Sequence, residues 1–210
     1  MYALKVLHKK LCLACPFIHQ KRLNMLVLAT QALLIGQRLS LTQLGRRLCS
    51  KALTKHKIKR VDRLLGNPHL HQERTAIYQF LCGELLKGHS RPVIIVDWSD
   101  LTTERDYHLL RASVPVGGRG LTLYEEVHPQ KDIVSDKVHK RFLNTLQSLL
   151  PEGCQPIVIT DAGFRNPWFK AVLALGWDYV GRVRNRDLLK PVNKGIWTHC
   201  KQLYRRAQAK

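Results

Sequence analysis

The chain has 210 residues, 45% of them hydrophobic, which allows one or two packed domains and excludes a mostly disordered protein. Lys and Arg number 35 against 15 Asp and Glu, so the formal net charge is +20. This excess favours an anionic partner, with nucleic acid ahead of an acidic membrane surface. The charge is uneven, because residues 1–90 contain 16 Lys and Arg but only three acidic residues. The distribution predicts a binding part followed by a part that carries chemistry.

The cysteines and the apolar segments argue against two further classes of protein. The six cysteines are scattered, and only Cys12 and Cys15 form a Cys-x-x-Cys pair, so neither a disulfide framework nor a zinc ribbon is predicted. Residues 25–36 form the longest apolar stretch, which is too short to span a bilayer. Because free thiols suit a reducing compartment, we expect a cytoplasmic protein without a membrane partner.

The first ninety residues are predicted to be helical. Residues 21–35 carry apolar side chains at helical spacing and are followed by a glycine that would end the helix. Ser40 and Gln43 then form a capping box at the start of a short second helix, and this pair indicates a helix-turn-helix-like unit. Asn67 and Pro68 begin another helix, which is predicted to run to about residue 86.

The helix predicted over residues 54–65 is strongly basic. Around an apolar stripe it carries Lys55, Lys57, Lys59, Arg60 and Arg63. A charged helix face is usually only solvated, but here the acids that would form i,i+4 ion pairs are missing apart from Asp62. We therefore predict that these five side chains bind DNA through its phosphates. We interpret Arg182, Arg184 and the rest of the segment up to Arg186, at the end of the last predicted strand, in the same way.

Short β-branched runs replace the helical pattern from residue 91 onward. Strands are predicted over residues 92–98, 108–116, 121–127, 156–160 and 178–183, and helices over 135–150 and 166–175. The resulting order is strand-strand-strand-helix-strand-helix-strand. It predicts an α/β domain with a mixed sheet over residues 91–186. Residues 187–210 are basic and only weakly periodic.

Two aspartates follow apolar runs of this predicted sheet. Asp97 comes after the apolar residues of the first strand, and Asp161 directly follows the fourth. If these strands are neighbours, the two carboxylates lie close together. Such a pair suits Mg²⁺, and two such ions can promote phosphoryl transfer on a nucleic acid. An aspartate after a strand is also a common turn or cap residue, so a structural role for each stays open at this point.

Four stretches of the chain form longer motifs. They read KRLN from Lys21, TKHKIKRVDRLLGN from Thr54, VDWSD from Val96 and TDAGF from Thr160. Together they resemble the transposases of the bacterial "insertion sequence four" family. Members of this family are cut-and-paste enzymes with an Asp-Asp-Glu active site on a ribonuclease-H-like fold. The resemblance covers essentially the whole chain. It implies that the second residue of VDWSD and of TDAGF, Asp97 and Asp161, are catalytic residues and metal ligands for Mg²⁺, which Mn²⁺ can replace.

The resemblance also implies partners and a reaction. In the family the N-terminal helices help to bind the terminal inverted repeats of double-stranded DNA, so residues 1–90 are expected to form a DNA-end-binding region. Hydrolytic nicking at the ends is followed by strand transfer from the freed 3′-hydroxyl. Full-length members act as homodimers, and a cytoplasmic, nucleoid-associated protein is expected.

One departure from the family concerns the third carboxylate. In the family it is a Glu in a Tyr-Arg-Glu-Lys signature beyond an inserted subdomain, and no Tyr-x-x-Arg-x-x-x-Glu pattern occurs in this chain. Glu125 and Glu126 lie on a predicted strand, where we expect them to be structural. We therefore expect a core truncated at its C-terminus, with residues 187–210 as the start of that subdomain or a disordered tail, and no transposition by the chain alone. The alternatives are a non-catalytic DNA-binding fragment that inhibits transposition and a ribonuclease-H-like nuclease or resolvase.

Overall fold

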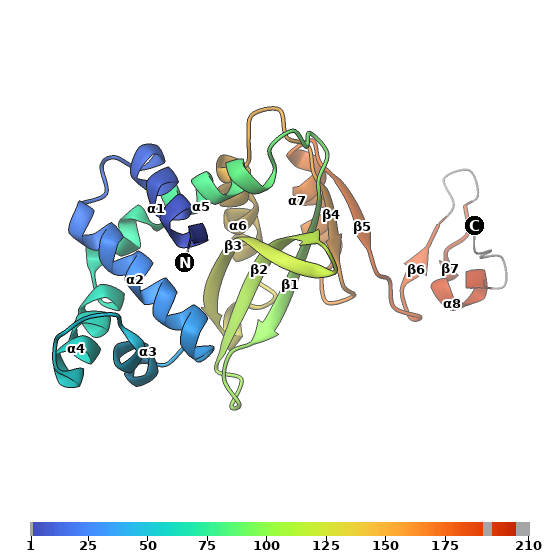
Figure 1. Ribbon diagram of the computed structural model, residues 1–210. Coiled ribbons are helices and arrows are strands. Elements are labelled where there is room, and N and C mark those ends of the chain that lie inside the picture. Colours follow the sequence, from blue (N-terminus) through green and yellow to red (C-terminus); the bar gives the residue numbers. More distant parts are fainter. Residues whose placement is uncertain (1, 191–194, 205–210) are drawn as a thin grey trace. The chain divides into compact units, whose positions relative to one another are not determined.

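The computed structural model describes residues 2–190 and 195–204 (Figure 1). The chain divides into two compact units, residues 1–84 and residues 85–210. The division lies close to the point where the sequence changes from a basic helical pattern to a strand pattern. We call these parts unit 1 and unit 2.

Unit 1 is built from helices. They are α1 (Tyr2–Ala14), α2 (Gln20–Gly36), α3 (Leu41–Arg47), α4 (Thr54–Leu65) and α5 (Pro68–Leu85). Helical spacing predicted all of these except α1, in which lysines interrupt the apolar positions. Leu11 of α1 is nevertheless buried, together with Cys15, Ile18 and Leu23. The buried face of α1 is therefore determined by the residues that pack against it, more than by the hydrophobic periodicity of its sequence.

A close approach between α3 and α4 organises the second half of unit 1. A Cβ atom at Gly45 would lie 2.5 Å from the Cα atom of Ile58, so a larger residue requires one helix to move. Val61, which is fully buried, packs beside this contact with Leu44 and Leu48. The close contact explains why a glycine is present inside the short helix α3, where it otherwise weakens helix formation.

Within residues 2–190 and 195–204, no single helix is long and apolar enough to cross a bilayer. Helices α2 and α3 reach the length and apolar composition of a membrane span only when taken together, and they are bent by 98° relative to each other.

Unit 2 is built on a five-stranded mixed sheet. Its strands are β1 (Val93–Asp100), β2 (Tyr107–Val116), β3 (Arg119–Pro129), β4 (Ile157–Thr160) and β5 (Asp178–Gly181). They lie in the order β3-β2-β1-β4-β5, with antiparallel pairs from β3 to β1 and parallel pairs from β1 to β5 (Figure 1). The predicted α/β class and mixed sheet are thus confirmed. This architecture is compatible with a ribonuclease-H-like fold.

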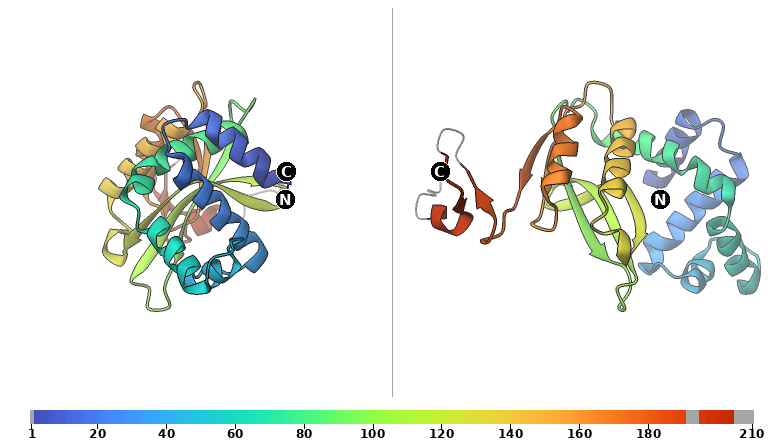
Figure 2. Two further views of the ribbon diagram at one scale, coloured as in Figure 1. Left: turned by 60° about the vertical axis from the view of Figure 1, so that its left-hand side comes forward. Right: turned by 180° about the vertical axis from the view of Figure 1, so that it is seen from behind.

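Two helices cover one face of the sheet. A short 3₁₀ turn, η1 (Gln130–Asp132), leads into α6 (Asp136–Leu149), and α7 (Asn166–Ala174) follows β4; the view from behind shows both helices on the same face (Figure 2). The Ser135 side chain caps α6 by accepting a hydrogen bond from the Val138 N–H. Phe142 and Leu146 of α6 are fully buried. The amphipathic pattern that predicted this helix therefore also gives its orientation.

A small hairpin follows the sheet. Strand β6 (Leu188–Leu189) pairs antiparallel with β7 (Thr198–His199), and α8 (Cys200–Leu203) comes next. The weak periodicity of this segment predicted none of these elements. Residues 191–194 and 205–210 lie outside the described part of the chain. The expectation of an inserted subdomain or a disordered tail over residues 187–210 therefore stays a prediction.

Candidate active site

The register of the sheet brings Asp97 and Asp161 together. Strands β1 and β4 are parallel neighbours in which Val96 lies opposite Thr160, so the two aspartates are the next residue on each chain. Neighbouring strands are about 4.8 Å apart. Asp97 lies within β1, which continues to Asp100 and not only to residue 98 as expected, whereas Asp161 is the first residue after β4. The predicted juxtaposition is present, and the role of the pair stays a prediction.

A row of charged residues crosses the whole sheet at this level. Asp97 is paired with Arg111 on β2, and Arg111 is paired with Glu125 on β3. On the other side the Arg182 N–H donates to the carbonyl of Thr160 at 3.1 Å, so Arg182 follows β5 at the level of Asp161. The order across the sheet is Glu125, Arg111, Asp97, Asp161, Arg182. The two carboxylates therefore have an arginine position on each side.

The electrostatics of the pair favour a cation. Burial raises the pKa of Asp97, and the nearby Asp161 carboxylate raises it as well, whereas a hydrogen bond from the Trp98 backbone N–H lowers it. The Oδ1 atom of Asp161 accepts a hydrogen bond from the Gly163 N–H at 2.9 Å. A positive ion shared by the two carboxylates would offset both the burial and the repulsion.

The donor set is small for a metal site. Over residues 2–190 and 195–204, no group of three or more His, Cys, Asp and Glu side chains is arranged to hold a metal ion. Mg²⁺, however, is usually bound by one or two carboxylates and completes its shell with water and substrate phosphates. The pair Asp97 and Asp161 therefore fits Mg²⁺ better than a metal that needs a closed protein site.

Glu125 and Glu126 are both engaged within the sheet. Glu125 accepts a hydrogen bond from Arg111 Nε at 2.8 Å. The Glu126 carboxylate, which is only 12% exposed, accepts hydrogen bonds from Tyr124 Oη at 2.6 Å, His128 Nε2 at 2.7 Å and Arg141 Nη2 at 3.1 Å. Burial alone would raise the pKa of Glu126, but these hydrogen bonds outweigh it and lower the pKa. This geometry supports the structural role expected for both residues.

An aromatic cluster supports the strand that carries Asp97. The indole Nε1 of Trp98 donates to His139 Nε2 on α6 at 3.4 Å. Burial lowers the pKa of His139, so its neutral ring can accept this hydrogen bond. The same ring packs against Phe164, 5.5 Å away between centroids, in the loop that follows Asp161. The cluster thereby connects β1 with the loop that holds the second aspartate.

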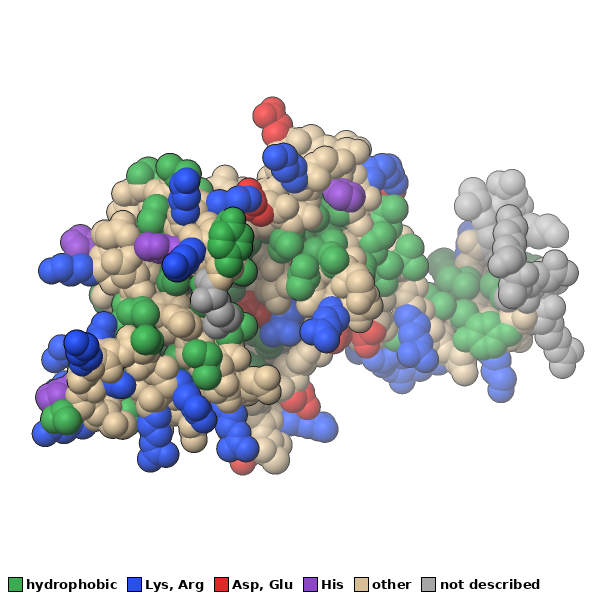
Figure 3. Space-filling view, viewed as in Figure 1, with side chains coloured by type: hydrophobic (Ala, Val, Ile, Leu, Met, Phe, Trp, Pro, Cys, Tyr) green, Lys and Arg blue, Asp and Glu red, His purple; other side chains and the backbone are tan. Residues whose placement is uncertain are grey.

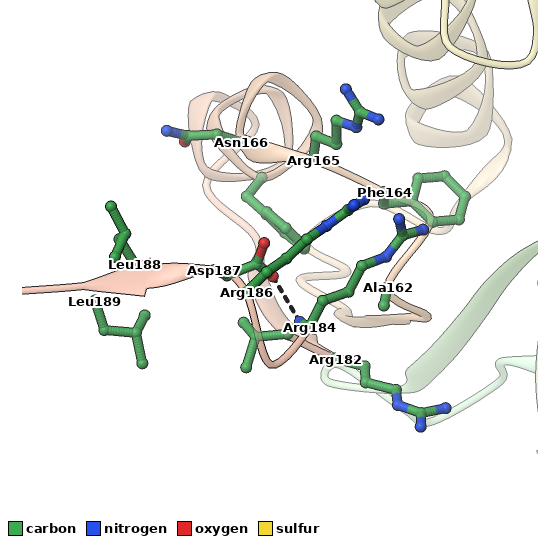
Figure 4. Close-up of a pocket in the computed structure, with 12 residues that line it drawn as sticks. Ala162, Phe164, Arg165, Asn166, Arg182, Arg184, Arg186, Asp187, Leu188 and Leu189 are labelled. Atoms are coloured by element: carbon green, nitrogen blue, oxygen red, sulfur yellow. Dashed lines mark hydrogen bonds between the residues drawn. The ribbon is translucent and has the colours of Figure 1, made fainter. Parts of the chain in front are cut away.

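An arginine-lined hollow lies next to that loop. It encloses about 560 Å³ and is lined by Arg165, Arg182, Arg184 and Arg186, with Phe164 and Phe169 among the apolar residues (Figure 4). The Arg184 and Arg186 side chains extend in the same direction, toward Phe164. The Arg184 backbone N–H donates to Asp187 Oδ2 at 2.6 Å, which holds the turn that carries both arginines.

The segment that contains Arg182, Arg184 and Arg186 was interpreted as basic and phosphate-binding, whereas Arg165 was missed. Arg182 and Arg184 were predicted from their place at the end of a strand, and the structure puts them in one hollow. Arg186 belongs to the same segment, RVRNR, and lines the same hollow. Arg165 comes four residues after Asp161, but only the path of the loop shows that it faces the same space. Arg184 and Arg186 extend together in Figure 4, whereas the Arg165 and Arg182 side chains extend away from them, and Asp187 is the acidic residue of the lining. The excess of arginine makes the hollow suitable for an anionic ligand.

The basic residues predicted on the helix over residues 54–65 lie on α4 in unit 1. Lys55, Lys59, Arg60 and Arg63 are exposed, and Lys57 is partly buried. Arg60 and Arg63 line a hollow that α4 shares with α2, whereas the three lysines do not line it. The surface of unit 1 in view carries several separated Lys and Arg side chains (Figure 3).

These observations define a mixed α/β protein with two carboxylates at neighbouring parallel strands and a cluster of arginines beside them. The sequence profile of the family described as "Transposase DDE domain" matches residues 88–209, which is more than half of the chain. The chain therefore belongs to the transposase DDE domain family. No curated protein and no solved structure has significant similarity to it.

Membership of the family has direct consequences for function. It makes the chain a DNA-processing enzyme by family, with DNA as the implied substrate, and supports a transposase over a ribonuclease-H-like nuclease or a resolvase. Divalent metal ions are generally used in this family. The predicted DDE transposase is thus confirmed at the level of the family. The match covers the sheet of unit 2 but not helices α1 to α5.

Proposed function

We propose that the chain binds the ends of an insertion element and cleaves DNA there, with Asp97 and Asp161 as catalytic metal ligands, as in the "insertion sequence four" transposases that it resembles. The observation that carries this proposal is the parallel register of β1 and β4, which places the two carboxylates side by side. An aspartate that served only as a turn residue would have no reason to lie beside a second carboxylate that raises its pKa.

Asp97 and Asp161 would hold Mg²⁺, or Mn²⁺ in its place. When bound, the ion supplies positive charge at the scissile phosphate and lowers the pKa of an attacking water or hydroxyl. The chain's own residues orient the site. Trp98 and His139 keep β1 in place beneath Asp97, and the hydrogen bond from Gly163 to Asp161 limits the rotation of that carboxylate.

The arginine-lined hollow would guide the DNA strand to the two carboxylates. Arg182 follows β5 at the level of Asp161, and Arg165, Arg184 and Arg186 line the same space. Guanidinium groups suit this task because they form paired hydrogen bonds with phosphate oxygens. The basic residues of unit 1 would bind the terminal repeat, at a distance along the chain from the cleavage site.

A second candidate function is inhibition of transposition by a chain that binds element ends without cutting them. The observation in its favour is that Glu125 and Glu126 are both committed to hydrogen bonds within the sheet. Neither is free to act as the third carboxylate of an Asp-Asp-Glu site.

Nicking of a supercoiled plasmid that carries the element ends tests the proposed function. Asp97→Asn and Asp161→Asn should each reduce Mn²⁺- or Mg²⁺-dependent nicking about 10³-fold, because each removes a ligand from an ion worth several kcal/mol to the transition state. The matched control is Asp178→Asn, which alters an exposed carboxylate paired with Arg91 at the other end of the same sheet. Nicking that survives Asp97→Asn unchanged would refute the assigned site.

Metal binding gives a second readout that does not depend on activity. Mn²⁺ should raise the unfolding temperature of the wild-type chain and of Asp178→Asn, but not that of Asp97→Asn, because a ligand stabilises only a folded state that binds it. A wild-type chain that binds Mn²⁺ and DNA without nicking would favour the inhibitor over the enzyme.

A further inference from the structure

Unit 1 contains a basic hollow in which only some of the lining residues, Arg60 and Arg63, were predicted to bind DNA. It encloses about 750 Å³ between the start of α2 and the second half of α4. Lys21, Arg22 and Asn24 line it from α2, and Arg60 and Arg63 line it from α4. Two of the four stretches that resemble the transposase family, KRLN and the basic helix, therefore meet at one place.

One stripe of α4 forms its side of the hollow. Arg63 and Leu64 lie three and four residues after Arg60, which is the spacing of a single helix face, and Asn67 lines the hollow from just beyond the end of α4. Lys55 and Lys59 belong to the same helix, but they do not line the hollow. The basic residues of α4 are therefore structurally unequal, although the sequence makes them look alike.

Of the Lys and Arg side chains that line the hollow, Arg22 alone is paired with a carboxylate among the described residues, that of Glu73. Unit 1 has only three acidic residues, and the described ion pairs within residues 2–84 use Glu73 and Glu84, which bind Arg22 and Lys10. No ion pair joins a carboxylate to Lys21, Arg60 or Arg63 in the described part of this unit.

Two neighbouring residues of the KRLN stretch have different roles. The Arg22 side chain is largely buried and donates from Nε to Glu73 Oε2 at 2.8 Å, which fastens α2 to α5. Lys21 is exposed and turns to the hollow. Both residues line the hollow, but the Arg22 guanidinium is already paired with Glu73, so Lys21 is the one of the two that is available to a ligand.

The lining suits a nucleotide more than an isolated anion. The hollow has apolar residues, Met25, Leu28 and Leu64, beneath its cationic rim. Guanidinium and ammonium groups bind phosphate oxygens, and an apolar surface can accept the face of a deoxyribose. The volume is also larger than a single phosphate needs.

We propose that this hollow binds the sugar–phosphate backbone of a DNA duplex, with Arg60, Arg63 and Lys21 on successive phosphates and the apolar floor against the sugars. The proposal rests on the proposed function in that it takes DNA as the ligand. It departs from the uniform basic face predicted for α4. Arg60 and Arg63 make defined contacts, whereas Lys55 and Lys59 contribute only to the general field of the protein.

Binding of the full chain to a short fluorescent duplex, followed by anisotropy in EDTA over a range of salt concentrations, tests the proposal. Arg60→Gln with Arg63→Gln should weaken binding at least about tenfold and reduce the slope of log K against log salt by about two, because each lost phosphate contact removes close to one released counterion. The matched pair, Lys55→Gln with Lys59→Gln, removes the same charge from the same helix. It should weaken binding less than about threefold and change the slope by less than about one.

Further variants separate a DNA contact from a folding defect. Arg60 donates to Ser50 Oγ at 3.2 Å and so has a contact within the protein. Arg63→Gln and Lys21→Gln do not touch that contact, and each should still reduce the slope by about one. Circular dichroism should show unchanged helix content in every variant.

Two outcomes would overturn the proposal. Equal losses in the two matched pairs would mean that net charge alone acts, and unchanged binding after Arg60→Gln with Arg63→Gln would mean that DNA does not enter the hollow. Because EDTA prevents cleavage, these results do not depend on Asp97 and Asp161. If the chain nicks DNA but gives one of these two outcomes, DNA binding in the hollow is refuted and the proposed cleavage function stands. If the variants differ as expected but the chain does not nick DNA, the cleavage function is refuted and DNA binding in the hollow stands.

Discussion

Units 1 and 2 use charge in different ways. In unit 1 the cations are distributed around helices, and the few carboxylates mostly serve ion pairs that hold the helices together, such as Arg22 with Glu73. In unit 2 the charges of Asp97, Asp161 and Arg182 are aligned by strand register. A helix spreads charge around a cylinder, which suits attraction of a polyanion. A sheet holds groups at a constant spacing, which suits chemistry that needs two carboxylates at one point.

The two units can also be followed separately in solution. All four tryptophans lie in residues 91–210, so tryptophan fluorescence reports on unit 2. Far-ultraviolet circular dichroism at the helix band is dominated by the five helices of unit 1. Substitutions in one unit can therefore be tested for effects confined to that unit.

The largest expected effect is on the packing of unit 1. Gly45→Ala should destabilise it by about 2–3 kcal/mol, because the added methyl group meets the backbone of Ile58 and overpacking of this kind costs a few kcal/mol. The control is Gly83→Ala on α5, where the methyl group meets nothing within 4 Å and should stabilise the helix by up to about 1 kcal/mol. Denaturant unfolding followed by circular dichroism measures both.

The fluorescence transition tests whether the units are independent. Gly45→Ala should leave the unfolding of unit 2 unchanged when tryptophan emission is followed. If Gly45→Ala shifts the circular dichroism and fluorescence transitions equally, the two units unfold together. Units 1 and 2 would then differ in how they use charge but not in stability.

A smaller effect is expected from the buried carboxylate of unit 2. Glu126→Gln should cost about 1–2 kcal/mol at pH 7, because it weakens three hydrogen bonds to a side chain that is only 12% exposed. The matched change, Glu125→Gln, affects an ion pair with the half-exposed Arg111 and should cost less than about 1 kcal/mol. Fluorescence-detected unfolding in denaturant measures both.

The Glu126 effect should depend on pH in a defined direction. The pKa of Glu126 is lowered by folding, so its carboxylate contributes stability above the ordinary glutamate pKa of about 4.3, and that contribution is lost as the pH falls through the folded pKa. The difference between wild type and Glu126→Gln should therefore shrink below about pH 4. A difference that is constant from pH 7 to pH 3 would contradict a role for the ionised form.

The smallest effect is expected at Asp97, and its sign is opposite. The pKa of Asp97 is raised by folding, so the folded state loses stability as the pH rises from the ordinary aspartate pKa of about 3.9 through the raised value. Without metal at pH 7, Asp97→Asn should therefore be more stable than wild type, by less than about 1 kcal/mol, and the two should converge near pH 3. If wild type is more stable than Asp97→Asn in EDTA, the Asp97 carboxylate is stabilised by a favourable partner, and burial and repulsion from Asp161 do not dominate.

Much of this architecture could be predicted because its elements have strong local patterns. The apolar stripe of α4 and the glycine after it place both ends of that helix where the structure has them. The pairing of Asp97 with Asp161 could also be predicted, since each follows an apolar run and the carboxyl ends of parallel strands meet at one edge. What local pattern misses is α1, whose apolar face is defined by contacts with distant residues such as Ile77 and Phe80.

The remaining parts of the site depend on geometry that the sequence does not express locally. Arg111 lies beside Asp97 only because β2 pairs with β1 in one particular register. Arg165 reaches the hollow next to Asp161 through the path of a loop, and Lys21 meets Arg60 only when α2 packs near α4. The sequence thus allowed prediction of single site residues that have a recognisable position on one helix or strand. It did not allow prediction of clusters whose residues come from several helices, strands or loops.

The register of β1 against β4 has a consequence for how such a protein can diversify. The separation of Asp97 and Asp161 is maintained by hydrogen bonds between neighbouring strands, so the length of the polypeptide that connects them is unconstrained. The β2–β3 turn at Gly117 and Gly118, where both φ angles are positive, can accept an insertion or a new chain terminus without moving either aspartate. A slip of one residue between β1 and β4, by contrast, would displace one carboxylate by about 3.3 Å and separate the pair. We therefore expect the chain to tolerate changes in the length of the hairpin and not a change in the register of β1 against β4.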